Sequence, residues 1–219
     1  RNTRLGTNAG DAFSGTDATD NTLIGYDAGT AITTGDKNVA VGNYAGDAVT
    51  TGNSNNTVGY QAGSAISTGS NNNFFGALAG KSATTSDFNC AFGQEALEAT
   101  TTGSANIAIG FRALEANTTG ANSVAVGAYA LDGATTAGGN SVAIGYLSAS
   151  GALESTVVAV GYRALFANTT GATNTAVGYD AMVANTTGDY NVAVGGFALD
   201  ANTTASDNTA VGYQALTAN

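Results

Sequence analysis

Glycine and aliphatic residues recur along the chain at a nearly constant interval. A glycine preceded by an apolar residue, here called the marker glycine, recurs every 17 residues over most of the 219-residue chain. The unequal steps are a first step of 19 and an 18 followed by a 16 around Gly145, which together restore the phase. A fixed period of this size indicates stacked repeats, and the compensated slip indicates that neighbouring repeats hold each other in register. The marker glycines are Gly6, Gly25, Gly42, Gly59, Gly76, Gly93, Gly110, Gly127, Gly145, Gly161, Gly178, Gly195 and Gly212.

The residues before each marker glycine alternate in a way that is typical of a short strand. An apolar residue precedes the glycine, and in many repeats a second one stands two positions earlier, as in Val39 and Val41 or Val124 and Val126. Apolar, mostly β-branched residues at positions i and i+2 predict a strand whose Val and Ile side chains face inward. The residue between them is usually Ala, which would then face outward and allow another chain or layer to approach closely.

The residues after the marker glycine predict a core column and a corner. Ala almost always stands three positions on, followed by Gly in the early repeats and by Leu in the later ones. From this change we expect the core or an interface to widen toward the C-terminus. A Thr-Thr-Gly segment follows, and its glycine suits a tight corner. In ten of the thirteen repeats Asn stands four positions before the marker glycine, which predicts a column of amides hydrogen-bonded along the stack.

Seventeen residues are too few for a strand and a packed helix, so the sequence predicts an all-β fold. We expect a parallel β-solenoid of about thirteen 17-residue coils, forming one repeat domain over residues 1–219 that is a fragment of a longer fibre. Coils stacked about 4.8 Å apart would give a length of roughly 60 Å. So thin a solenoid buries little apolar area by itself, which favours trimerisation about the long axis.

Two segments carry a resemblance to known families. "NSVAVGAYA" at 122–130 and "NSVAIGYLSAS" at 140–150 resemble the head repeats of YadA-like trimeric autotransporter adhesins. "NTAVGYDAMVANTTG" at 174–188 is similar to repeats of phage tail-fibre-like proteins and bacterial surface proteins. The resemblance implies a left-handed β-roll that is trimeric, extracellular on a cell or virion surface, and concerned with attachment or spacing. It also implies a host-surface glycan or protein receptor as a partner besides the homotrimer itself.

Composition and charge narrow the classes of function. The net charge is −10, with six basic residues, so we expect no nucleic-acid partner. The sequence has no long apolar run, which predicts no direct insertion into a membrane. The apolar content of 43% and the absence of proline argue against disorder.

The residues that usually carry catalysis or bind metals are few. The chain has no histidine, which excludes Ser-His and Cys-His arrangements, and Glu95, Glu98, Glu115 and Glu154 suggest no catalytic pair. We therefore predict a protein that is not an enzyme, with no metal site and no cofactor. Cys90 is the only cysteine and is expected to be a buried thiol. The additional aromatic residues Phe74, Phe75, Phe88 and Phe92 are expected to widen the core locally.

Two surface columns are candidates for binding, and each has two interpretations. The first consists of paired threonines, represented by Thr118, Thr169, Thr186 and Thr203. Regular threonine columns can bind ice, but adjacent threonines beside a glycine are also expected from turn chemistry. The second consists of the tyrosines that follow marker glycines, represented by Tyr162, Tyr179 and Tyr213. Their rings suit packing or an interface between chains, and alternatively stacking on sugars.

A further pattern is a match to the acceptor motif for N-glycosylation. Asn-Thr-Thr occurs at Asn117, Asn168, Asn185 and Asn202. In a bacterial or phage product we expect this match to be accidental.

Overall fold

The computed structural model describes residues 1–13, 17–135, 139–151 and 156–217, and it contains thirteen short strands and no helix within them. The chain divides into two compact units, Arg1–Asn106 (unit 1) and Ile107–Asn219 (unit 2). Both units repeat the same coil. The expectation that residues 1–219 form a single repeat domain stays a prediction. No helix in the described part of the chain could cross a membrane.

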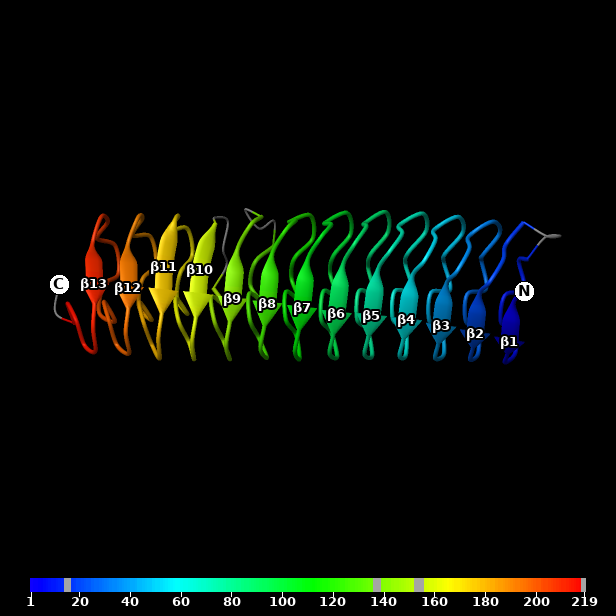
Figure 1. Cartoon of the computed structure of the whole chain (residues 1–219), viewed down its shortest axis with the longest axis horizontal. Helices are drawn as coiled ribbons and strands as arrows, with labels where there is room; N and C mark the ends of the chain where they lie inside the picture. The colour runs from blue at the N-terminus through cyan, green and yellow to red at the C-terminus, as the bar shows by residue number, and fades with distance from the viewer. Residues whose placement is uncertain (14–16, 136–138, 152–155, 218–219) are drawn as a thin grey trace. The chain divides into compact units, whose positions relative to one another are not determined.

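The strands of each unit are parallel and follow sequence order, each pairing with the next within its unit (Figure 1). Unit 1 holds β1 (Thr3–Leu5), β2 (Thr22–Ile24), β3 (Val39–Val41), β4 (Asn56–Val58), β5 (Asn73–Phe75) and β6 (Cys90–Phe92). Unit 2 holds β7 (Ile107–Ile109), β8 (Val124–Val126), β9 (Val142–Ile144), β10 (Val157–Val160), β11 (Asn174–Val177), β12 (Val192–Val194) and β13 (Thr209–Val211). The prediction of an all-β parallel solenoid is therefore confirmed in both units.

The predicted register is also confirmed. Val160 pairs with Val177, and Val177 pairs with Val194, so equivalent residues of successive coils lie directly side by side. The compensated slip leaves the pairing undisturbed, because Val126 pairs with Ile144 and Ile144 with Val160. The added and the missing residue are thus accommodated between the strands.

The predicted orientation of the strands is wrong. In each strand from β2 to β13 the residue two positions before the marker glycine is buried and lies between two outward positions, as in Ala40, Ala125 and Ala193. The flanking aliphatic residues face outward and are half-buried or exposed, with Ile109 42% and Ile144 41% exposed. Larger side chains from the turns, such as Leu114 and Leu165, already fill much of the narrow interior. The inward strand position is therefore mostly Ala, and the branched residues on either side of it remain outside.

Three columns of side chains fill the narrow core: the inward residue of each strand, the residue that follows the buried Ala, and the residue three positions after that one. Where one of them is larger, another is smaller. Where Gly follows the buried Ala at Gly29, Gly46 and Gly63, an Ile or Val stands three residues later, as in the pairs Gly29–Ile32 and Gly63–Ile66. At Gly80 the residue three positions later is Ala, and the ring of Phe74 lies against the glycine instead. Where Leu follows, as at Leu114, the residue three positions later is Ala, Thr or Asn. The leucines from Leu97 to Leu199 are fully buried and fill the core, and the column that shrinks beside them offsets their volume; Leu216, in the last coil, is 47% exposed. Close packing of this kind tolerates little net change in volume.

The cluster of phenylalanines does not widen the core as a group. Only Phe74 is buried, and a Cβ atom at Gly80 would overlap its ring. Phe75 and Phe92 stack on the outer face of the sheet with ring centroids 4.6 Å apart, and Phe88 is 64% exposed. The prediction of a buried thiol is also wrong, because Cys90 lies on the same outer face of the sheet and is only half-buried. This partial burial raises the pKa of the thiol.

Replacement of Gly80 by Ala should destabilise unit 1. Gly80 has a φ of +57°, which costs a residue with a Cβ atom about 1 kcal/mol, and contact with Phe74 adds an overpacking cost of about 1–3 kcal/mol. We therefore expect the free energy of unfolding of Gly80→Ala to fall by about 2–4 kcal/mol in urea titrations. Gly196→Ala is the control, because its Cβ atom would lie 3.5 Å from Tyr213, an ordinary contact. Equal effects of the two substitutions would contradict the proposed crowding.

Candidate functional site

Side chains of one kind form columns along neighbouring coils of a unit, because every coil places the same position above its counterpart. Four such columns contain the residues that the sequence singled out: two amide columns, a threonine column and an aromatic column. A fifth consists of the outward aliphatic residues of the strands. No pocket is found in the portion of the chain that the structure describes.

The first amide column, four residues before the marker glycines, hydrogen-bonds along the stack as predicted. The Oδ1 atom of Asn38 accepts the backbone N–H of Asn55 at 3.0 Å, and Asn38 in turn donates its own N–H to Oδ1 of Asn21 at 2.8 Å. The Nδ2 atom of Asn38 donates to the carbonyl oxygen of Gly52 at 2.8 Å. These buried amides therefore tie the start of each strand to the glycine corner of the next coil. In unit 2 the same bonds join Asn174 and Asn191.

A second amide column consists of the asparagines of the Asn-Thr-Thr segments. Asn185 donates from Nδ2 to Oδ1 of Asn168 at 2.8 Å and to the carbonyl of Gly188 at 3.1 Å. Asn202 repeats this arrangement with Asn185 at 2.9 Å. The four asparagines are at most 2% exposed, so they belong to the core and its corner turns.

The threonine column has the geometry of turn chemistry. Thr118, Thr169 and Thr186 each donate their hydroxyl to the backbone carbonyl of the same position in the next coil, at 2.7, 3.0 and 2.9 Å. Thr203 supplies the last of these carbonyls. The second threonine of each pair is the more regularly exposed one. Its column comprises Thr34, Thr51, Thr68, Thr85 and Thr102 in unit 1 and Thr119, Thr170, Thr187 and Thr204 in unit 2.

The tyrosine column is exposed in this chain and its rings contact one another. Tyr162 and Tyr179 stack with centroids 4.9 Å apart and an interplanar angle of 9°. Tyr213, 71% exposed, meets the edge of Phe197. Stacked rings cover each other's faces and offer mainly their edges and hydroxyl groups, which is less suited to sugar stacking than isolated rings are.

Two members of the aromatic column of unit 2 were not found from the sequence, nor was Tyr44 of unit 1, which contacts Tyr26 and Tyr60. In unit 2 every coil supplies one ring, and where Ala128 or Gly196 follows the marker glycine the next residue supplies it, namely Tyr129 or Phe197. The signal was therefore present one position later in the repeat. The complete column of unit 2 comprises Phe111, Tyr129, Tyr146, Tyr162, Tyr179, Phe197 and Tyr213.

An ion pair supports this column. Arg163 donates two hydrogen bonds, of 2.8 and 2.7 Å, to the carboxylate of Asp180, which is 5% exposed. These bonds raise the pKa of Arg163. The guanidinium lies 5.5 Å from the ring centroid of Tyr162, a distance at which cation–π attraction operates. The ion pair therefore holds the Arg163 guanidinium beside the ring of Tyr162, at the edge of the aromatic column.

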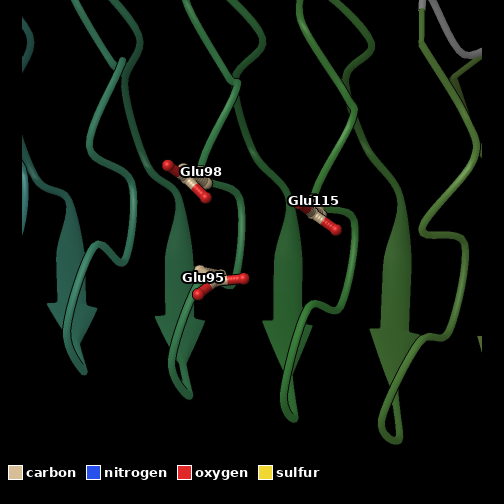
Figure 2. Close-up of side chains that lie close together, drawn as sticks. All are labelled: Glu95, Glu98 and Glu115. Atoms are coloured by element: carbon tan, nitrogen blue, oxygen red, sulfur yellow. The ribbon is translucent and has the colours of Figure 1, made fainter.

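Three of the four glutamates considered for catalysis have a partner within their own unit. Figure 2 shows Glu95 and Glu98 on the turn after β6 of unit 1, and Glu115 after β7 of unit 2. Glu95 accepts a hydrogen bond from Gln94 at 2.8 Å, Glu98 pairs with Lys81 at 3.4 Å, and Glu115 pairs with Arg112 at 3.3 Å. Because they belong to two units, we assign them no common site. Glu154 lies outside the described residues.

The outward aliphatic columns are the most extensive feature of the surface of unit 2. Twelve of the fourteen outward strand positions of β7–β13 are Val or Ile, the others being Thr175 and Thr209. In unit 1 the equivalent positions include Asn56, Asn73 and Cys90, so its sheet face is more polar. Contiguous exposed apolar surface of this kind is typical of association sites in other proteins.

Comparisons with protein-family models, with curated proteins and with solved structures found no match for this chain. The resemblance to adhesin heads and tail-fibre repeats therefore stays a prediction from the quoted segments.

The half-buried carboxyl of Asp132 in unit 2 makes the stability of the fold depend on pH. Burial raises its pKa to about 6, the charge of Glu115 adds to the rise, and Arg112 opposes it. Its Oδ1 atom is buried without a hydrogen-bond partner. The folded state thus binds more protons than the unfolded state between the ordinary pKa of 3.8 and about 6, and the free energy of unfolding falls as the pH rises through this window.

We expect Asp132→Asn to raise the free energy of unfolding at pH 7 by about 1 kcal/mol, allowing for solvent screening of a half-exposed group, and to have a smaller effect at pH 4. Urea titrations at both pH values measure this. Asp207→Asn, on an exposed turn, is the control and should leave the difference between the two pH values unchanged. A gain for Asp132→Asn that is the same at both pH values would refute the assigned cause.

Proposed function

We propose that the chain is a structural and adhesive segment of an extracellular fibre, and that three copies associate through the outward faces of their sheets. The observation that carries this proposal is the pair of outward Val and Ile columns on β7–β13. The proposal assigns the chain no catalysis, and its partner beyond itself is a host-surface glycan or protein receptor.

The outward columns call for a covering surface. Residues such as Ile109, Ile144 and Val194 remain 37–42% exposed in the single chain. Covering each apolar side chain removes area from water at about 25 cal/mol per Å², which favours association when many columns are covered together. The aromatic column adds tyrosines and Arg163, residue types that are enriched at the centres of protein interfaces.

A second copy of this chain fits the surface better than an unrelated partner. The face has no pocket in the described region, and its side chains repeat at every coil. A partner must therefore be flat and carry the same spacing, and another copy satisfies both conditions without adaptation. Cyclic symmetry closes such an interface. The number of three copies and the extracellular setting rest on the resemblance to adhesin heads.

The polar surfaces are consistent with a spacer whose coils resist opening. Hydroxyl and amide side chains at the corners bond to the next coil, as Thr186 and Asn191 do. Such bonds hold the corners closed and limit local opening, which a protease requires. Receptor binding would then use surface that the assembly leaves exposed.

We expect the purified chain to have the mass of a trimer in light scattering coupled to size exclusion. Single substitutions Ile144→Lys and Val177→Lys should shift the mass to that of one chain, because each would place a charge in the covered face. Their far-ultraviolet spectra should remain those of a β protein. Alkylation of Cys90, on the outward face of β6, should be slower in the assembled chain than in the chain unfolded by urea.

The matched control is Thr187→Lys, which adds the same charge on the exposed corner and should leave the trimer intact. A wild-type chain that stays a monomer at tens of micromolar would overturn the proposed assembly. A trimer that survives both substitutions on the sheet would overturn the proposed location of the interface.

Binding to ice is the second candidate function, and one observation favours it. The second threonines Thr34, Thr51, Thr68, Thr85 and Thr102 occupy five consecutive coils of unit 1 and are all exposed. Adjacent strands space such side chains about 4.8 Å apart, which gives a regular file of methyl and hydroxyl groups. The first threonines, including Thr118, Thr169, Thr186 and Thr203, are less suitable, because three of these four hydroxyls donate to backbone carbonyls.

If the exposed threonines bind ice, micromolar protein should show thermal hysteresis and shape ice crystals. Thr68→Lys, in the middle of the file, should remove most of this activity. Asn71→Lys changes an exposed residue of the same corner outside the file and should retain it. Absence of hysteresis in the wild-type chain would remove this candidate.

A further inference from the structure

The chain has five sequence matches to the N-glycosylation acceptor Asn-x-Ser/Thr, and all of them lie in the core. Besides the four Asn-Thr-Thr segments, Asn55 is followed by Asn56 and Thr57. The five acceptor asparagines are 0–2% exposed. The exposed asparagines Asn43, Asn53, Asn71, Asn122 and Asn140, in contrast, have neither Ser nor Thr two positions later.

The nitrogen atom that would receive a glycan is already occupied in the folded coil. In Asn185 both Nδ2 protons are used, toward Oδ1 of Asn168 at 2.8 Å and the carbonyl of Gly188 at 3.1 Å. In Asn55, Nδ2 donates to Oδ1 of Asn38 at 3.2 Å and to the carbonyl of Gly69 at 2.8 Å. A modified amide would lose one of these bonds and would place a sugar where the next coil lies.

We propose that these five asparagines are acceptor sites in the unfolded chain only, so that N-glycosylation and closure of the coil exclude each other. The donor is an oligosaccharide linked to a lipid pyrophosphate. In the transfer, Nδ2 forms a bond to C1 of the first sugar, the bond from C1 to the pyrophosphate oxygen breaks, and Nδ2 releases one proton. The lipid pyrophosphate leaves with the electron pair of that bond.

Exclusion acts in both directions. A chain that folds first hides every acceptor amide, whereas a chain that is modified first cannot restore the amide columns that join neighbouring coils. Burial of even one polar group without its partner is unfavourable, and a core position offers no room for a sugar. The inference concerns the single coil and is independent of the proposed assembly.

The sequence offers a way to remove four acceptors without touching the core. The last residues of the Asn-Thr-Thr segments, Thr119, Thr170, Thr187 and Thr204, are exposed. Replacing all four by Val removes the motif but keeps each asparagine and the hydroxyl of each central threonine. An exposed acceptor can be created by Val124→Thr, which completes the motif at Asn122, and Thr already occupies the same strand position at Thr175.

The first test uses purified oligosaccharyltransferase with a lipid-linked oligosaccharide and the full chain folded in its absence. We expect glycan at Asn122 of the folded Val124→Thr variant and at least tenfold less at the five native acceptors, measured by mass spectrometry. The native acceptors should become modified when the transfer is carried out during synthesis into microsomes. Equal modification of native acceptors and of Asn122 on folded chain would overturn the inference, as would failure to modify Asn122, because exposure would then not be the determinant.

The second test passes the wild-type chain and the fourfold Thr→Val variant through a eukaryotic secretory pathway and compares glycan occupancy with protease resistance. Chains carrying a glycan at Asn117, Asn168, Asn185 or Asn202 should be digested, and so should chains of either form that carry one at Asn55, which the fourfold variant keeps. Chains of either form without glycan should resist. Wild-type chains that are secreted without glycan and resist the protease also support the inference, because folding then preceded transfer of the oligosaccharide. A resistant, β-structured chain with a glycan at Asn185 would refute it.

Discussion

The direct stacking of one coil on the next is the interaction on which the other features of both units depend. Parallel strands pair position for position, and the turns also bond to their counterparts, as Tyr44 does from its N–H to the carbonyl of Tyr26 at 2.9 Å. Space between the stacked marker glycines is so limited that a Cβ atom at Gly178 would collide with the carbonyl of Gly195. Each position of the repeat therefore lies against the same position of the neighbouring coil, and side chains are arranged in columns.

This constraint explains why the repeat was predictable and the orientation of its strands was not. The 17-residue period, the strands before each marker glycine and the Asn column follow from identities that recur in sequence. Which face of a strand is inside depends on the width of the coil. A pattern of three residues in the sequence does not reveal that width. The general expectation that branched apolar residues lie inside fails here, because the interior accepts Ala40 or Ala125 and leaves Val39 or Val124 outside.

The surface columns were predicted as sets of residues, but their chemistry required coordinates. Thr118 and Thr186 could be recognised as recurring, yet only the structure shows that their hydroxyls donate to a carbonyl one coil away. The aromatic column was underestimated because its ring moves between two adjacent positions, as from Tyr179 to Phe197. Single-position counting misses such an exchange, although both positions project from the same turn.

The compensated slip around Gly145 has a consequence for how such a chain can change its length. Irregular spacing is accommodated between strands, while Ile144 still pairs with Val126 and Val160. Since each coil interacts mainly with its two neighbours, gain or loss of one whole coil would rejoin equivalent partners and preserve every column. A single-residue insertion without a nearby compensating deletion would instead misalign all coils beyond it. Genetic duplication in multiples of 51 nucleotides is thus the mode of lengthening that such a fold permits.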